Sequence, residues 1–203
     1  MPPAPLPEPK TQRGRASRER LVEVAAQSVA EHGISQLRLD EVLSAAGASK
    51  SQMYHYFSDR DGLVEAAVSH RCGEVLAKLE SAFARVESFE DLETVLAGFA
   101  TDYARQLTGC PIGTLAAELT DGPDGARSLV TDAFGSWEGL LADALSRIRA
   151  NGELTSDADP AELATGLLAA MEGGMLLGQV RADPAPLRVA LTVGLGYIAT
   201  FRK

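Results

Sequence analysis

Residues 35–63 constrain this chain more than any other stretch, because they join two short helical patterns through a tight turn. The first pattern places apolar residues three and four positions apart, which predicts a short amphipathic helix. These residues are Leu39, Val42, Leu43 and Ala46. Gly47 follows where a left-handed residue commonly ends a helix, and Ser49 and Gln52 have the spacing of a capping box that begins the next one. Two helices joined in this way are typical of a helix-turn-helix, whose second helix enters the major groove of DNA.

The second predicted helix carries more polar and aromatic side chains than its packing needs. Met53 and Phe57 lie four residues apart and can face the core, whereas their neighbours bear hydroxyl, imidazole, amide and ammonium groups. Such groups suit contacts to phosphates and base edges. We therefore predict that DNA is contacted by Ser49, Lys50, Ser51, Gln52, Tyr54, His55 and Tyr56. A surface helical hairpin, with the aromatic rings filling a small core, is the alternative.

These expected contacts differ in what they recognise. Ser51 and Gln52 are expected nearest the base edges, and Gln52 can pair with adenine through two hydrogen bonds. Lys50 is expected to bind phosphate whatever the base sequence. Further candidates for DNA contact are Arg38, Arg13 and Arg15. The last two belong to a basic arm that can lie along a groove, and a solvated arm without DNA contact is the alternative.

The run over residues 46–63 resembles the DNA-binding signature of the TetR (tetracycline repressor) family. It reads Ala-Gly-Ala-Ser-Lys-Ser-Gln-Met-Tyr-His-Tyr-Phe-Ser-Asp-Arg-Asp-Gly-Leu. Three positions depart from the family pattern: Ser51 replaces a usual glycine, Leu43 a usual alanine, and Leu39 a threonine that often caps the preceding helix. The resemblance implies an all-α protein of about nine helices, with an N-terminal three-helix helix-turn-helix domain and a C-terminal helical ligand-binding and dimerisation domain. It also implies a transcriptional regulator, a repressor of a palindromic operator.

The composition agrees with an all-helical chain, and the distribution of charged residues shows where its excess of acidic residues lies. Hydrophobic residues make up 45% of the 203 residues, with Ala and Leu abundant and β-branched runs scarce. A net charge of −9 would by itself argue against nucleic acid as a partner. However, the first 60 residues hold 8 Lys and Arg against 7 Asp and Glu, whereas the remaining 143 hold 11 against 21. The acidity therefore belongs to the distal part, which leaves the first part free to approach phosphates.

We expect the chain to divide into an arm, a head and a body. Residues 1–16 are proline-rich and lack apolar periodicity, which predicts a flexible arm. Residues 17–60 should form the helix-turn-helix domain, and residues 61–203 the effector-binding and dimerisation domain. Outside the helix-turn-helix, helices are predicted at 17–32, 61–86, 89–107, 112–119, 124–150, 160–183 and 186–201, with a turn at 121–124. Ser58 and Asp61 are expected to cap the helix that links head and body.

The last two predicted helices are apolar on almost every side and contain several glycines, so they must be buried. One explanation is a central helix pair within a single chain. The other is a pair that packs against its copy in a second subunit. A helix-turn-helix that reads a two-fold operator requires a dimer, which favours the second explanation, and the TetR resemblance implies the same homodimer.

Aromatic and methionine side chains from several helices of the body predict an effector cavity. The TetR resemblance implies such a cavity, and flexible methionines with aromatic walls suit a small apolar or aromatic molecule. The candidate ligand-binding residues are Phe99, Tyr103, Leu107, Cys110, Phe134, Trp137, Met171 and Met175. Ordinary core packing is the alternative for most of these residues taken singly. Residues 109–119, Gly-Cys-Pro-Ile-Gly-Thr-Leu-Ala-Ala-Glu-Leu, also resemble a segment of family members with hydrophobic effectors.

Cys110 suggests a second hypothesis, a redox-responsive regulator. Pro111 suits the first position of a helix, which places Cys110 at the amino end, where free amides lower the pKa of a thiol. Cys72 falls within a helix and is expected to be inert. The alternative for Cys110 is a small apolar residue in the wall of the ligand cavity.

The sequence contains no catalytic motif, phosphate-binding glycine loop or zinc-ligand spacing, so we expect no enzyme activity, metal or cofactor. An all-α small-molecule-binding or catalytic domain is the remaining alternative, and DNA affinity would distinguish it. Two cysteines are too few for a disulfide framework. No signal sequence opens the chain, and its longest apolar stretch, residues 189–201, is too short to span a bilayer, so we expect a cytoplasmic protein without membrane contact.

Overall fold

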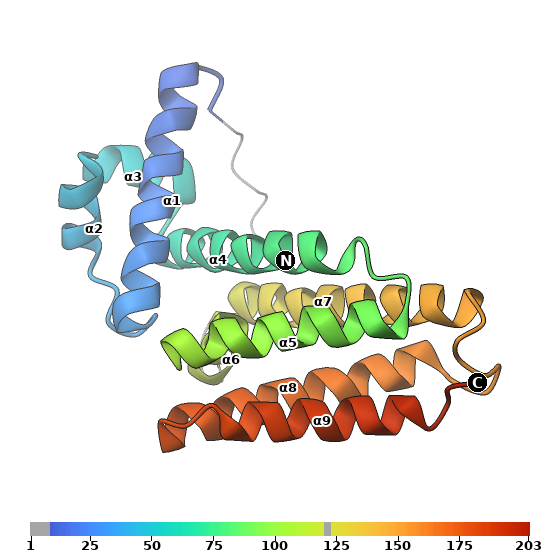
Figure 1. Ribbon diagram of the computed structural model, residues 1–203. Helices are drawn as coiled ribbons and strands as arrows, with labels where there is room; N and C mark the ends of the chain where they lie inside the picture. The colour runs from blue at the N-terminus through green and yellow to red at the C-terminus, as the bar shows by residue number, and fades with distance from the viewer. Residues whose placement is uncertain (1–8, 120–122) are drawn as a thin grey trace. The chain divides into compact units, whose positions relative to one another are not determined.

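The computed structural model describes residues 9–119 and 123–203, and the regular structure within them is helical (Figure 1). The nine helices in these residues are α1 (Gln12–His32), α2 (Leu39–Ala46), α3 (Lys50–Phe57), α4 (Arg60–Phe83), α5 (Phe89–Gln106), α6 (Pro111–Glu118), α7 (Asp124–Ala150), α8 (Pro160–Arg181) and α9 (Ala185–Ala199). The prediction of an all-α chain, a helix-turn-helix domain followed by a helical domain, is confirmed. The turn expected at 121–124 and the first eight residues of the expected arm lie wholly or partly outside the described residues.

The described residues divide into two compact units. The first unit holds residues 9–74 and the described part of 114–131, and the second holds residues 75–113 and 132–203. Helices α4, α6 and α7 therefore each contribute to both units. This division differs from a boundary at residue 60, because the first half of α4 packs with the first unit.

Helix α1 begins at Gln12, so the predicted start at residue 17 and the predicted flexible arm are wrong for residues 12–16. The Thr11 side chain caps the helix, because its Oγ1 accepts a hydrogen bond from the Gly14 N–H at 3.1 Å. Residues 12–16 are exposed or half-buried. A helix end that lies in solvent needs no apolar periodicity, and for this reason its pattern gave no helical signal.

The helix-turn-helix forms as the sequence predicts. Helix α2 ends at Gly47, whose φ of 60° is left-handed. Ser49 caps α3, and Ser49 and Gln52 form both hydrogen bonds of a capping box. Met53 and Phe57 are buried, and so is the apolar stripe of α1, Leu21, Val22, Ala25, Ala26 and Val29. Burial of the apolar side chains leaves the polar side chains of α3 outside the core.

The junction between α3 and α4 differs from the prediction in its capping residue. Asp59, rather than Ser58 or Asp61, accepts a hydrogen bond from the Gly62 N–H, at 2.8 Å from its Oδ1 atom. Ser58 instead turns the chain, with a φ of 59°. A Cβ atom at Gly62 would overlap the Phe57 carbonyl oxygen, so this tight junction requires glycine.

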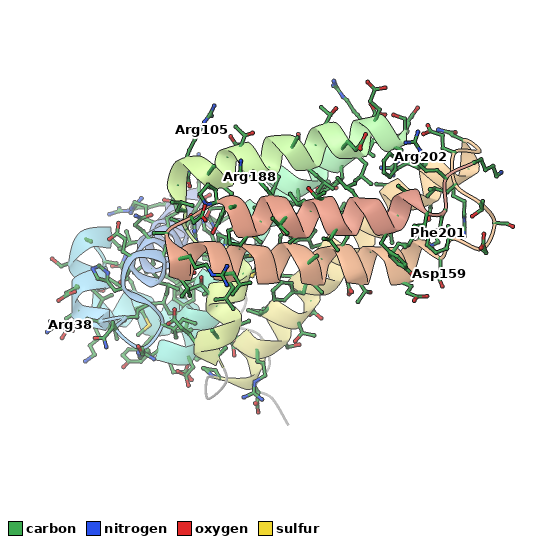
Figure 2. The ribbon with its side chains drawn as sticks, turned by 60° about the horizontal axis from the view of Figure 1, so that its bottom comes forward. Arg38, Arg105, Asp159, Arg188, Phe201 and Arg202 are labelled. Carbon is green, nitrogen blue, oxygen red and sulfur yellow. The ribbon has the colours of Figure 1, made fainter. Side chains whose placement is uncertain are left out.

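Helices α8 and α9 form an antiparallel pair in the second unit. Figure 2 shows them side by side, with Asp159 before α8 and Phe201 after α9 at the same end of the pair. The Asp159 carboxylate accepts hydrogen bonds from two amides of the first turn of α8, at 2.9 and 3.4 Å, which is the predicted cap. A Cβ atom at Gly174 would lie only 2.8 Å from the Leu187 Cα atom, so the two backbones approach closely.

Helix α8 is long and apolar enough to cross a membrane by length and composition alone, so the expectation that residues 189–201 were the longest such stretch is wrong. Within its most apolar window, 44% of the residues are buried inside the structure. One helix of this kind is weak evidence for a membrane span, because a buried core helix passes the same test.

Candidate DNA interface and ligand cavity

The first unit presents the side chains of α3 that were predicted to contact DNA. Ser49, Lys50, Ser51, Gln52, Tyr54 and His55 are exposed, and Tyr56 is half-buried. Tyr54 is 46% exposed, so its side chain is accessible to a partner. The Tyr56 ring lies against its neighbours, with its centroid 5.4 Å from that of His55 and 6.2 Å from that of Phe57. Hydroxyl, imidazole and ammonium groups are therefore all available on this short helix.

The capping box engages part of this surface. The Gln52 Oε1 atom accepts a hydrogen bond from the Ser49 N–H at 2.8 Å, and the Ser49 Oγ atom accepts one from the Gln52 N–H at 3.2 Å. Both residues remain exposed, so the box does not hide them from DNA. It directs the Gln52 amide oxygen toward the Ser49 N–H, and this oxygen keeps a second lone pair for another donor.

The arginines that were predicted to contact DNA are exposed in the same unit: Arg13, Arg15 and Arg38. The Arg38 guanidinium lies 2.9 Å from the Glu41 carboxylate, and Figure 2 labels this arginine at the edge of the head. Arg15 donates hydrogen bonds to the carbonyl oxygens of Pro9 and Lys10, both at 3.2 Å. Exposed contacts of this kind are weak, so a phosphate group can compete for either arginine.

Two charged side chains hold the turn between α1 and α2. Glu118, the last residue of α6, accepts a hydrogen bond from the Ile34 N–H at 2.5 Å. Arg60, the first residue of α4, donates to the carbonyl oxygens of Ile34 and Leu37, at 3.0 and 3.4 Å. Sequence reasoning missed both residues. The Glu118 contact spans 84 positions in the chain, so no local pattern indicates it.

The second unit contains an open cavity of about 680 Å³, a volume in the range of small-molecule sites. Its wall consists of Val75, Lys78, Leu79, Ala82, Phe83, Val95, Gly98, Phe99, Asp102, Tyr103, Gln106, Thr108, Gly109, Cys110, Pro111, Trp137 and Met175. The cavity thus brings together five of the residues that were predicted to bind a ligand, Phe99, Tyr103, Cys110, Trp137 and Met175. The residues of α4 in this wall were not singled out from the sequence.

Three of the predicted ligand-binding residues lie outside the cavity wall. Met171 is fully buried, one helical turn before Met175. Leu107 ends α5 with a left-handed φ of 48° and is half-buried. Phe134 is half-buried on α7, one turn before Trp137. The chemistry of these side chains favoured a ligand contact, but the packing of each helix decides which turn reaches the cavity.

The cavity wall is mainly apolar, and Lys78, Asp102, Gln106 and Thr108 add charged and polar groups to it. The Tyr103 hydroxyl donates a hydrogen bond to the Met175 carbonyl oxygen at 2.8 Å, and burial raises the pKa of Tyr103. The Trp137 ring lies against Phe99, with centroids 6.2 Å apart. Trp137 is 1% exposed, and its Nε1 atom has no hydrogen-bond partner among the residues that the structure describes. Aromatic rings and a methionine thus form part of the mainly apolar wall that a ligand would meet.

Cys110 lies in the cavity wall, before the N-terminus of α6, where its Sγ atom accepts a hydrogen bond from the Gly113 N–H at 3.4 Å. The expectation of a lowered pKa is nevertheless wrong. Burial raises the pKa of the Cys110 thiol far above its ordinary value, the negative charge of Glu172 raises it further, and the Gly113 amide does not offset them. Burial also raises the pKa of Cys72 and of Glu172. Cys110 is therefore a neutral thiol in the wall, and the redox hypothesis loses its basis.

Helices α8 and α9 expose large apolar side chains. They are Leu176, Leu177 and Val180 of α8, and Val189, Val193 and Tyr197 of α9. Val180 is 77% exposed and Val193 is 67% exposed. The three residues of α9 are four positions apart, so they lie on one side of that helix. Exposed apolar surfaces of this kind mark interaction sites.

Known families match both ends of the chain. The family described as "Bacterial regulatory proteins, tetR family" matches residues 21–67, and the family described as "Tetracyclin repressor-like, C-terminal domain" matches residues 89–193. The chain is 31% identical to the HTH-type transcriptional regulator Rv0196 of Mycobacterium tuberculosis, over 84% of this chain and 88% of that protein. It is 28% identical to the transcriptional regulator AcuR of Cereibacter sphaeroides, over 82% and 78%. It is also 28% identical to the HTH-type transcriptional repressor NemR of Escherichia coli, over 91% and 94%.

Solved structures share the fold. The reduced form of NemR from E. coli superposes with a TM-score of 0.76 at 24% identity, over 92% of this chain and 97% of that one. A TetR-family transcriptional regulator from Cytophaga hutchinsonii superposes with a TM-score of 0.81 at 19% identity, over 96% and 98%. These likenesses show the fold, and the sequence matches lead to one conclusion: the chain belongs to the TetR family and is a DNA-binding transcriptional regulator, not an enzyme.

Proposed function

We propose that this regulator is a repressor that binds a palindromic operator as a homodimer and is released by a small apolar or aromatic molecule. The exposed polar and aromatic side chains of α3 support the operator contact. The largely apolar cavity of about 680 Å³ supports the ligand, and it is the single observation that carries the inducible mechanism. A regulator that binds an operator must share a compartment with the chromosome, so we also propose that the protein is cytoplasmic.

Two kinds of side chain on α3 support operator binding. Lys50 is exposed at the first position of the helix, where an ammonium group binds phosphate irrespective of base sequence. Ser51, Gln52 and Tyr54 offer hydrogen-bonding groups for base edges. The first 60 residues are nearly neutral, with 8 Lys and Arg against 7 Asp and Glu. DNA phosphates should therefore repel this region less than the net charge of the whole chain suggests.

Replacing Lys50 by alanine should weaken binding to operator and to non-specific DNA by similar factors. The slope of log affinity against log salt concentration should become shallower by about 1, because one phosphate contact is lost. Fluorescence anisotropy over a salt series measures both quantities. Lys203→Ala, which removes an exposed lysine of the second unit outside the cavity wall, is the matched control and should leave the slope unchanged. A loss confined to operator DNA, with the original salt slope, would contradict the phosphate role.

The exposed apolar side chains of α8 and α9 support a homodimer through these helices. Water contact with such surface is unfavourable by roughly 25 cal/mol per Å². A two-fold operator also requires two heads related by a two-fold axis, so the same patch on each subunit must meet its copy. The close packing of α8 on α9 at Gly174 holds the two helices in one arrangement, so their exposed apolar side chains form one surface for this contact.

We expect Val193→Glu to convert the dimer into a monomer, because it places a charge inside an apolar contact. Val193 is 67% exposed in the single chain, so the folded subunit should tolerate the change. Sedimentation velocity at micromolar concentration measures the mass, and circular dichroism checks the helix content. Ser136→Glu, at an exposed position of α7, is the control. A double variant, Val180→Glu with Val193→Glu, that remains dimeric would show that another surface forms the interface.

Two of the helices that line the cavity also hold the head, which supports a mechanism for release. Val75 and Leu79 of α4 and Pro111 of α6 belong to the cavity wall. At their other ends, the same helices hold the turn between α1 and α2 through Arg60 and Glu118. A ligand that displaces either helix therefore alters the position of the helix-turn-helix. Release requires that the ligand bind the DNA-free conformation more tightly than the DNA-bound one.

The nature of the wall favours an apolar or aromatic ligand, and residues 109–119 support it by their resemblance to family members with hydrophobic effectors. Gly98 lies in this wall, and a Cβ atom there would meet nothing within 4 Å. Gly98→Leu should therefore fill the cavity without disturbing its neighbours. We expect it to weaken binding of N-phenyl-1-naphthylamine, an uncharged aromatic fluorophore, by about tenfold or more.

Fluorescence titration measures this affinity, and operator affinity should stay the same in Gly98→Leu. Gly135→Leu is the matched control, because Gly135 is a glycine of α7 with an equally free Cβ position outside the cavity wall. It should bind the fluorophore as the original chain does. Equal affinity in Gly98→Leu and the original chain would mean that the cavity is not the ligand site.

A further inference from the structure

The wall of the cavity in the second unit divides into an apolar interior and a polar rim. The interior is buried and includes Leu79, Phe83, Trp137 and Met175. The rim consists of four exposed residues that bring charged and polar groups, Lys78, Asp102, Gln106 and Thr108. Such a site suits an amphipathic molecule, because its apolar part can be buried while its polar group stays near water.

The position of Lys78 on α4 places it at this rim. Lys78 follows Val75 by three residues and precedes Ala82 by four, and both of these residues line the cavity as well. Residues with this spacing share one face of a helix. Leu79, the next residue, is buried in the wall, whereas Lys78 is exposed. The Lys78 ammonium group is therefore accessible beside the apolar interior.

The two charged residues of the rim differ in their pairing. The Asp102 Oδ1 atom lies 3.4 Å from the Arg105 guanidinium, so a positive charge already accompanies this carboxylate. Lys78 forms no ion pair with any residue that the structure describes. An unpaired ammonium attracts an anion more strongly than a paired carboxylate attracts a cation. The rim therefore favours a ligand with a negative charge.

The other titratable groups of the wall do not offset Lys78. Burial raises the pKa of Tyr103 and of Cys110, so both side chains are uncharged near neutral pH. Residues 61–203 hold 11 Lys and Arg against 21 Asp and Glu, and this acidity opposes an anion. Salt screens exposed charges that lie further than about 8 Å away, however, so the nearest charge has the largest effect.

We propose that the effector is an amphipathic organic anion, with its apolar or aromatic part in the buried interior and its acidic group on Lys78. The inference rests on the proposed function of the cavity as the ligand site, and it adds the chemical class of the ligand. Lys78 belongs to α4, which also carries Arg60 at the turn between α1 and α2. The acidic group is thus bound by one of the helices that hold the head.

Two fluorophores that differ by one charged group provide the test. N-phenyl-1-naphthylamine is uncharged, and 8-anilino-1-naphthalenesulfonate adds one sulfonate to the same aromatic groups. Fluorescence titration of the full-length protein gives the affinity for each. Gly98→Leu, which should fill the cavity, shows how much of the binding of each probe occurs there.

Lys78→Met keeps the length of the side chain and removes its charge. It should weaken binding of the sulfonate by about twofold to fivefold, the range of an exposed ion pair, and leave binding of the uncharged probe unchanged. Lys78→Arg should retain the sulfonate affinity, and 1 M salt should reduce the difference between Lys78→Met and the original chain. Lys203→Met, an exposed lysine outside this wall, is the control and should bind both probes as the original chain does.

Equal affinity for the sulfonate in Lys78→Met and the original chain would overturn the inference. So would an equal loss for both probes in Lys78→Met, because Lys78 would then contribute packing and not charge. If Gly98→Leu binds both probes as the original chain does, the cavity is not the ligand site, and the proposed function fails together with the inference. The first two outcomes leave the cavity as the ligand site, so they are distinguishable from the third.

Discussion

The turn at residues 33–37 is the constraint on which the arrangement of the head depends. Gly33, with a φ of 85°, ends α1 in a conformation that favours glycine. The Ile34 N–H then binds the Glu118 carboxylate, and the Ile34 carbonyl oxygen binds the Arg60 guanidinium. Hydrogen bonds to ionised groups are about twice as strong as those between neutral groups, and an irregular turn has no helical partners to replace them. The start of α2, and with it the position of α3, follows from these contacts.

The same contacts give a physical basis to the proposed control of DNA binding by a ligand. Two sites influence each other when they share an element that has two arrangements. We infer that α4 and α6 are such elements, because each carries residues of the cavity wall and ends at the turn between α1 and α2. The raised pKa of Cys110 fits this account, since an uncharged thiol before α6 suits a wall that holds an apolar ligand.

Local signals allowed much of the fold and of the candidate DNA interface to be predicted from the sequence. Gly47 as a helix end, the Ser49–Gln52 box and the Asp159 cap depend on residues that are close together in the chain, and all three are present. The buried stripe of α1 followed from its helical periodicity. The exposed side chains of α3 could be predicted because only Met53 and Phe57 have the apolar character and helical spacing of a buried face, and these two are the buried residues of the helix.

Features that depend on distant or competing partners could not be predicted in the same way. Glu118 meets Ile34 only because the fold brings them together. Met175 reaches the cavity while Met171 does not, although both share a helical face, because the packing of α8 decides the outcome. For Cys110, the amide of Gly113 is local and visible in the sequence, whereas the burial that outweighs it is a property of the folded unit.

Linkage between ligand and operator tests the central claim, that the cavity and α3 are energetically coupled. Isothermal titration calorimetry can measure the affinity of the dimer for N-phenyl-1-naphthylamine, with and without a saturating amount of operator. Reciprocity requires that the operator weaken fluorophore binding by the same factor by which the fluorophore weakens operator binding. We expect a factor of about five or more, the range of a typical coupling free energy. Identical fluorophore affinities with and without operator would contradict the account, because the cavity would then hold a molecule without influencing DNA.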